Sequence, residues 1–333
     1  MSNGKLFKSC LKNKILILDG ATGTMIQRQK LCEADFRGDV FKNHVVNLSG
    51  NNEILSITNP HIIENIHRVY LEAGADIIEC NTFNANSVSQ KKYQTENFIN
   101  DMNRSSIRLA RKLAEEYTKK DLSKPRFIAG SIGPTNKSVS IQGENSLTEN
   151  ITYDELYESY YEQAIVMSEE NVDIFLIETV FDVLNAKAAI DAVKKSQKET
   201  NTNIPIMVSA TLIKDSGKIL SGQTPEELYT SIESANPLVF GLNCSTGSAN
   251  LVTNMQKLSN IVSCAVSVYS NAGEPDETGN YKISPDDMAD EYEKLAKSGT
   301  VNICGGCCGT TPEHIKAISE RLKNFAPKNI NIL

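Results

Sequence analysis

Residues 173–180 read DIFLIETV, and this stretch decides the fold class. Its apolar side chains follow one another without alternation, and the run ends at two polar residues, Glu178 and Thr179. A strand with one face in water would alternate apolar and polar residues. A continuous apolar run of this length therefore indicates a strand that is buried on both faces, as in a parallel sheet covered by helices.

Seven further runs of this kind are spread along the chain. They read KILILDG (14–20), ADIIECNTF (75–83), RFIAGSIG (126–133), IPIMVSATL (204–212), LVFGLNCS (238–245), VSCAVSVYS (262–270) and VNICGGCCG (301–309). Helix-length segments lie between them, and the segment at 59–74 has Pro60 near its start and Gly74 at its end, as helices often do. Eight strands alternating with eight helices predict an α/β fold, a closed (β/α)8 TIM barrel. A doubly wound open sheet is the alternative.

The lengths of the connections orient this barrel. Connections from helix to strand are short, whereas three connections from strand to helix are long and polar, at 21–58, 133–151 and 271–284. Long strand-to-helix loops lie at the C-terminal face of a barrel, where active sites are built. We therefore expect the functional residues on that face.

Composition excludes two classes of partner. The chain has 333 residues and a net charge of −7, and it contains no block of Lys and Arg interleaved with aromatic residues, so we expect no nucleic acid partner. No apolar run approaches the roughly 18 to 20 residues of a membrane span, and the N-terminus does not read as a signal peptide. We expect a cytoplasmic protein without a membrane partner, whose eight cysteines bind metal, react or pack.

Polar residues and cysteines stand where several of the expected strands end. We single out Asp19 after strand one, Glu178 after strand four, Asn243 and Cys244 after strand six, and Cys307 and Cys308 after strand eight. Strands six and eight have one neighbour between them in a barrel, so three thiols can converge on one part of the rim.

Three thiols at a rim are the ligand set of a catalytic zinc site, which keeps a fourth position open. Adjacent side chains diverge in a strand, but the glycines at 305, 306 and 309 allow the chain to turn so that Cys307 and Cys308 face one ion. Two alternatives stay open. The cysteines can be buried packing residues, or Cys304 can join them in a closed four-sulfur site. The role of Cys80 is also open.

Asp19 and Glu178 can act in two ways. A carboxylate at the rim can bind the ammonium group of an amino acid through charge-assisted hydrogen bonds, or it can simply cap the next helix. A glycosidase acid/base pair is less favoured, because the chain has no Trp and few aromatic residues near these positions.

Seven motifs resemble one known family. They are ILDGATGTMIQ (17–27), EADFRGD (33–39), AGSIGPTN (129–136), LIETVFDVLNAKAA (176–189), LSGQT (220–224), FGLNC (240–244) and GGCCGTTPEHI (305–315). Together they are similar to the homocysteine S-methyltransferase domain, especially the N-terminal module of cobalamin-dependent methionine synthase. The resemblance implies a barrel over 12–325, between an N-terminal extension (1–11) and a C-terminal tail (326–333).

The resemblance also implies a site and a reaction. The zinc ligands would be Cys244, Cys307 and Cys308, homocysteine would contact Asp19 and Glu178, and Asn243 would belong to the same rim. The implied reaction is methyl transfer to the thiolate of L-homocysteine, giving methionine, with no catalytic residue beyond the metal site.

The chain departs from the family pattern at Cys80, at Cys304 and in SNAG (270–273), and nothing in it matches a cobalamin module. We therefore expect methylcobalamin to be supplied in trans by a separate domain or protein. Alternatives are S-methylmethionine or betaine as the methyl donor, a non-catalytic homocysteine-binding or docking module of a corrinoid complex, and a phosphate-binding barrel enzyme.

Overall fold

The computed structural model describes residues 3–141, 148–245, 247–277 and 279–330. Eight parallel strands form one sheet in the order β1-β10-β9-β8-β7-β6-β3-β2, and a bridge from Leu18 to Ile77 joins its two ends into a barrel. The predicted TIM barrel is confirmed, and the open sheet is excluded. Each predicted run contains one strand: β1 (Leu16–Ile17), β2 (Ile77–Glu79), β3 (Phe127–Ile132), β6 (Ile174–Val180), β7 (Ile206–Ala210), β8 (Val239–Cys244), β9 (Ala265–Ser270) and β10 (Ile303–Gly306).

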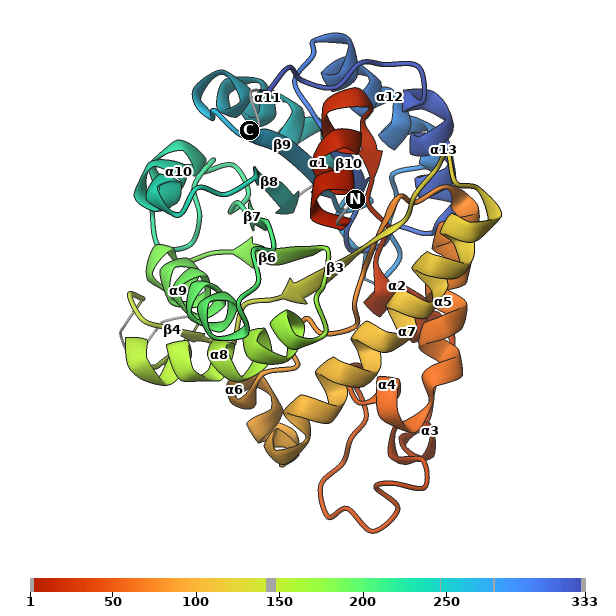
Figure 1. The fold of residues 1–333 in the computed structure, drawn as a ribbon, viewed down its shortest axis with the longest axis vertical. Helices are drawn as coiled ribbons and strands as arrows, with labels where there is room; N and C mark the ends of the chain where they lie inside the picture. Colours follow the sequence, from red (N-terminus) through yellow and green to blue (C-terminus); the bar gives the residue numbers. More distant parts are fainter. Residues whose placement is uncertain (1–2, 142–147, 246, 278, 331–333) are drawn as a thin grey trace.

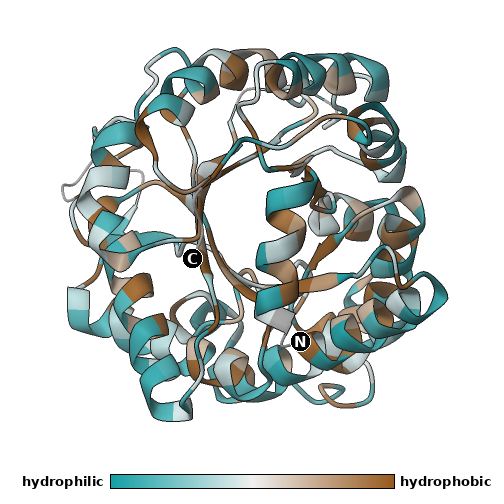
Figure 2. Ribbon diagram, turned by 45° about the horizontal axis from the view of Figure 1, so that its top comes forward, coloured by the Kyte–Doolittle hydropathy of each residue, from teal (hydrophilic) through white to brown (hydrophobic). Residues whose placement is uncertain are grey.

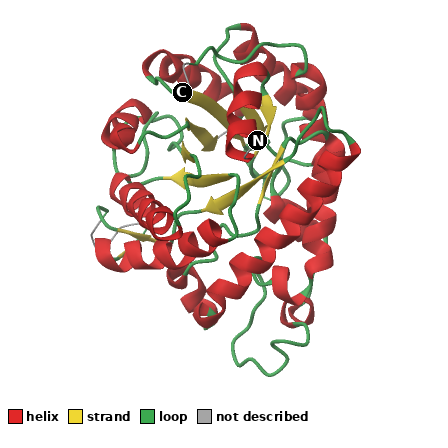
Figure 3. Cartoon of the chain, viewed as in Figure 1, coloured by secondary structure: helices red, strands yellow, loops and turns green. Residues whose placement is uncertain are grey.

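One long helix follows each strand of the barrel, and together these helices form the outer ring (Figures 1 and 3). They are α5 (Pro60–Ala73), α7 (Ile99–Lys120), α8 (Tyr153–Glu169), α9 (Val183–Thr200), α10 (Pro225–Ile232), α11 (Ser248–Ile261), α12 (Pro285–Lys297) and α13 (Pro312–Leu322). Among the helices of the described residues, none has the length and apolarity needed to cross a bilayer.

Further elements lie before β1 and in the connections. They are α1 (Asn3–Asn13), α2 (Thr22–Arg28), α3 (Glu33–Arg37), α4 (Leu55–Thr58), α6 (Ser87–Gln90), the 3-10 turns η1 (Lys91–Tyr93), η2 (Glu96–Phe98) and η3 (Glu233–Ala235), and a two-stranded sheet of β4 (Lys137–Ser138) and β5 (Glu149–Asn150).

Helix boundaries follow the expected chemistry. Pro60 occupies the first turn of α5, and Gly74 ends that helix at φ 111°, a left-handed conformation that glycine adopts without strain. At α12 the hydroxyl of Ser284 accepts a hydrogen bond from the backbone N–H of Asp287 at 3.2 Å. These caps satisfy groups at the helix ends that have no partner within the helix.

Two apolar cores hold the barrel together. Strand residues with outward side chains, such as Phe175 and Ile177, pack under the helices, and residues with inward side chains, such as Leu176 and Met207, fill the barrel. The inner core also contains Phe7 and Leu11 of α1, and the ring of Phe7 meets Phe127 edge-on at 5.0 Å.

Helix α1 lies across one end of the barrel (Figure 2), where its apolar side chains join the inner core. That end is where the strands begin, because Phe127 is the first residue of β3. The other end, where the strands finish, keeps the polar residues. The barrel interior is therefore packed with apolar side chains at the end where the strands begin, and it carries polar side chains at the end where they finish.

The first long loop has its own clamp. The carboxylate of Glu33 accepts hydrogen bonds from the backbone of Leu48 and Ser49, and Arg37 donates to the carbonyls of Phe41 and Val46. The EADFRGD motif thereby fixes the loop that follows it, which projects beyond α3 at the bottom of Figure 1.

Candidate functional site

The structure brings three thiols together at the strand ends. The Sγ atoms of Cys244, Cys307 and Cys308 all lie within 4.8 Å of one another. In the described part of the chain, no other group of three His, Cys, Asp or Glu side chains is close enough to share an ion. Cys304 is buried in the outer core, whereas its neighbour Ile303 faces into the barrel. The alternation of side chains along β10 thus keeps Cys304 out of the cluster.

Unusual backbone conformations make this convergence possible. Cys244 and Ser245 have φ values of 58° and 64°, and Gly309 has a φ of 80°. A Cβ atom on Gly309 would lie 2.1 Å from the ring of Tyr281, and one on Gly306 would lie 2.4 Å from the hydroxyl of Thr310. Glycine is needed at 306 because a side chain would collide with Thr310. At 309 it is needed for the same steric reason and also because its φ is left-handed. The left-handed conformation at Cys244 could not be predicted from the sequence, because the residue there is not glycine.

The thiols share negative charge unequally. Hydrogen bonds from Cys307 and Cys308 lower the pKa of Cys244 to about 3, and its thiolate in turn raises the pKa of Cys307 and Cys308. The cluster by itself therefore holds one thiolate and two thiols at neutral pH. Removing the other two protons requires a cation.

Three carboxyl groups lie at the same end of the barrel; the residues Asp19 and Glu178 are buried, and Glu79 is half-buried. Asp19 follows β1, Glu79 ends β2 and Glu178 lies in β6. Asp19 accepts a hydrogen bond from the backbone of Glu79 at 3.1 Å, and Ser131 donates to Glu178. The second oxygen of Asp19 is buried with no partner.

No Lys or Arg neutralises these carboxyl groups in any ion pair of the described residues. Burial raises the pKa of Glu178 to about 7, and the charge on Cys244 adds to this effect. Burial also raises the pKa of Asp19 and Glu79 well above the usual range, and the neighbouring carboxyl groups reinforce the shift. A cluster of this kind favours a bound cation or ammonium group.

Asn243 connects the two clusters. Its amide oxygen accepts hydrogen bonds from the backbone of Thr179 at 3.0 Å and from Ser209 at 2.8 Å. Its amide nitrogen donates to the Thr179 hydroxyl at 2.8 Å and lies 4.0 Å from the sulfur of Cys307. Most of its bonding capacity is therefore used within the protein. A direct contact to substrate stays a prediction.

Thr179 needs this support because its φ is 57°, which is strained for a β-branched residue. The pairing of β6 with β7 shifts register between Ile177 and Val180, so Thr179 lies in a bulge beside Glu178. Asn243 holds the bulge by two bonds.

Two further polar groups are buried beside these clusters: the hydroxyl of Tyr269, which lies close to Glu178 and Ser209, and the amide oxygen of Asn271. The amide nitrogen of Asn271 donates to the carbonyl of Ser245 at 2.6 Å, beside Cys244. Glu79 and Asn271 could have been singled out from their strand-end positions. Tyr269 and Ser131 lie within apolar runs, where nothing in the sequence distinguishes them from core residues.

A closed parallel barrel with clustered thiols and unpaired carboxyl groups at its strand ends is the arrangement of a barrel enzyme. The model of the homocysteine S-methyltransferase family matches residues 16–322, and the chain belongs to this family.

Solved structures with the same fold include the homocysteine methyltransferase MmuM from Escherichia coli. Its metallated form is 20% identical, with a TM-score of 0.73 over 96% of this chain and 100% of that one. Its apo form is 20% identical, with a TM-score of 0.65 over 93% of this chain and 97% of that one.

We expect Asn243→Ala to lower the free energy of unfolding by about 1–3 kcal/mol, because the buried donors on Thr179 and Ser209 lose their acceptor. Urea denaturation measures this change. Asn260→Ala, at an exposed position of α11, is the control and should have no effect. Equal stability of the two variants would show that Asn243 does not hold the bulge.

Proposed function

We propose that this protein transfers a methyl group to the sulfur of L-homocysteine, giving methionine, and that Cys244, Cys307 and Cys308 hold a zinc ion. One observation carries the proposal: three sulfurs within 4.8 Å of one another lie at the same barrel end as three carboxyl groups that belong to none of the ion pairs found in the described residues. An amino acid with a thiol needs both kinds of group, one at each end of the molecule.

The three cysteines fit zinc by distance and by chemistry. Tetrahedral zinc with sulfur ligands at about 2.3 Å holds the sulfurs about 3.8 Å apart, so a small inward movement of the thiols is sufficient. A divalent cation would also stabilise the deprotonated form of all three thiols, because its positive charge offsets the repulsion between neighbouring thiolates. The amide oxygen of Asn271, buried without a partner near Cys244, is a further oxygen donor at this place.

Different side chains would bind the two ends of homocysteine. Glu178, Asp19 and Glu79 would pair with the ammonium group of homocysteine, which orients its sulfur toward the cysteines. Zinc bound there would keep the substrate thiol deprotonated at neutral pH. The new bond joins the homocysteine sulfur to the methyl carbon, and the donor leaves with the electron pair of the broken bond. No side chain is required as a general base.

For the donor, we propose a methylcobalamin carried by a separate domain or protein. The motifs on which this rests are similar to the cobalamin-dependent branch of the family. A corrinoid is a large donor that requires an open rim, and the connections that follow β1 and β3 leave the barrel at this rim.

The first test is metal content. The purified protein should bind about one zinc per chain, and Cys244→Ala, Cys307→Ala and Cys308→Ala should each lose it, since a three-thiolate site is lost when one ligand is removed. Cys304→Ala is the matched control and should keep the metal. Elemental mass spectrometry measures the zinc content of each variant. The ligand set is wrong if Cys304→Ala empties the site while one of the other three variants retains zinc.

The second test concerns the carboxyl groups and uses methionine, which has no thiol to titrate. Glu178 has a pKa of about 7 and must lose its proton before it can pair with ammonium, so methionine affinity should rise between pH 6 and pH 8. Glu178→Gln and Asp19→Asn should weaken binding by about 1.5–3 kcal/mol and leave the zinc in place.

Calorimetry at several pH values measures the methionine affinity, and Glu178→Gln should also flatten the pH dependence. Glu162→Gln, exposed on α8, is the control and should behave like the unmodified protein. Unchanged affinity in both site variants would assign these carboxyl groups a purely structural role.

The third test identifies the donor. Zinc-loaded protein is incubated with homocysteine and either methylcobalamin, S-methylmethionine or betaine, and methionine is quantified. We expect slow turnover with free methylcobalamin, because docking supplies most of the orientation in such a transfer. Fast turnover with one of the other donors, and none with methylcobalamin, would reassign the donor. No turnover with any donor would favour a docking module.

A further inference from the structure

A cavity of about 980 Å³ opens at the end of the barrel opposite the thiol cluster, where β7, β8 and β9 begin. We refer to it as the basal pocket. Apolar side chains form its floor, and they are Ile204, Pro205, Ile206, Pro237, Leu238, Val262 and Ile330. The volume is that of a pocket for a small organic molecule.

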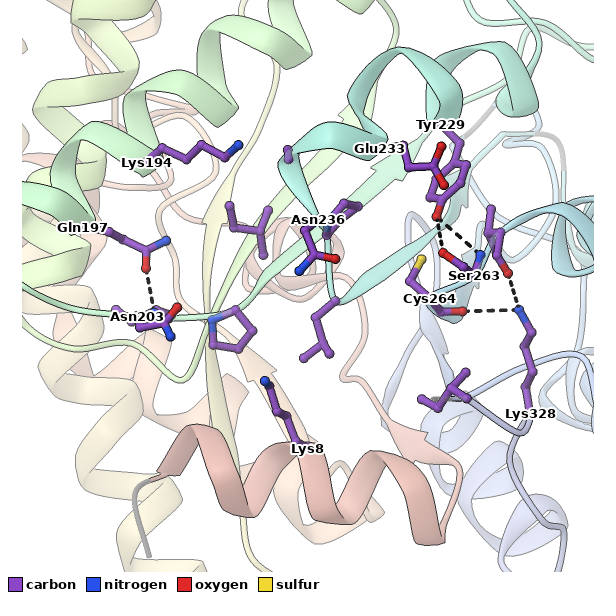
Figure 4. A pocket seen from close by; sticks show the side chains of 18 of the residues that line it. Lys8, Lys194, Gln197, Asn203, Tyr229, Glu233, Asn236, Ser263, Cys264 and Lys328 are labelled. Carbon is purple, nitrogen blue, oxygen red and sulfur yellow. Dashed lines mark hydrogen bonds between the residues drawn. The ribbon is translucent and has the colours of Figure 1, made fainter. Parts of the chain in front are cut away.

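Positive charge gathers around this pocket in a chain that is acidic overall. Lys8 comes from α1, Lys194 and Lys198 come from the end of α9, and Lys328 comes from the C-terminal segment. Figure 4 shows Lys8 and Lys194 pointing into the pocket from two sides, with Asn203 and Asn236 between them. Glu233 is the one carboxylate among the described residues that line it.

The lysines differ in what they already bind. Lys328 donates to the carbonyls of Val262 and Cys264 at 2.9 and 3.2 Å, so it closes one side of the pocket. Lys195, next to the pocket on α9, pairs with Glu199 at 2.7 Å. Lys194 and Lys198 line the pocket and belong to none of the ion pairs found in the described residues.

We propose that the basal pocket binds a small organic phosphate, with its phosphate groups at Lys194 and Lys198 and its apolar body on the floor. Lysine ammonium groups bind phosphate as point charges, and several together match a ligand with two or more negative charges. The apolar floor favours a phosphate ester over a bare inorganic ion. The concave shape and the acidity of the remaining surface argue against a nucleic acid.

This site is independent of the proposed methyl transfer, because the packed interior of the barrel separates it from the thiols. A ligand there would contact α1 and the C-terminal segment together with the barrel. Binding to the folded state alone would therefore raise the thermal stability of the protein.

Adenosine triphosphate, without magnesium, is a probe of the right size and charge, and calorimetry measures its binding. Lys194→Ala and Lys198→Ala should each weaken binding at least about tenfold. Lys119→Ala, at an exposed position of α7, is the matched control and should bind like the unmodified protein. Inorganic pyrophosphate tests the apolar floor and should bind more weakly than the nucleotide.

Acetylation of lysines in the unmodified protein is a second measurement that needs no variant. The nucleotide should protect Lys194 and Lys198 from acetylation and leave Lys195 and Lys119 reactive. Absence of binding at millimolar nucleotide, or equal loss of affinity in the Lys119→Ala control, would overturn the site. Pyrophosphate binding as tight as that of the nucleotide would overturn the organic part of the proposal.

Discussion

Three neighbouring carboxyl groups with no cationic side chain paired to them among the described residues are the constraint on which the site depends. Asp19, Glu79 and Glu178 come from three different strands and share one end of the barrel. Burying like charges without cations is unfavourable, and the raised pKa values of Asp19 and Glu178 reflect this cost. Under the proposed function, the ammonium group of homocysteine would supply the missing positive charge, and the stability lost at this end would serve substrate binding.

The parallel barrel is what makes this arrangement possible. All strands finish at one end, so residues that are far apart in the sequence are forced to meet there. The apolar inner core and the side chains of α1 fill the opposite end and hold the strand ends at fixed separation. The thiols at the ends of β8 and β10 and the carboxyl groups at the ends of β1, β2 and β6 therefore meet, although their sequence segments are far apart.

Much of the fold could be predicted because its signals are local. Continuous apolar runs, Pro60 and Gly74 each reflect the preferences of a few neighbouring residues, and all eight strands were found in this way. The strand ends also pointed to the three cysteines. By contrast, no local signal placed the N-terminal helix α1, whose Phe7 and Leu11 pack in the inner core. Such docking depends on tertiary contacts, which a helical pattern of residues does not reveal.

The bulge at Thr179 shows why the finer geometry of the site could not be predicted. It sets the direction of Glu178, and its stabilising partner, Asn243, comes from β8, two strands away in the sheet. Asn243 also lies next to Cys307, so the same amide touches the carboxylate strand and the thiol cluster. A shift of β6 would therefore move the surroundings of a cysteine as well as a carboxyl group. The strain at Thr179 is tolerated because one side chain holds both halves of the site in register.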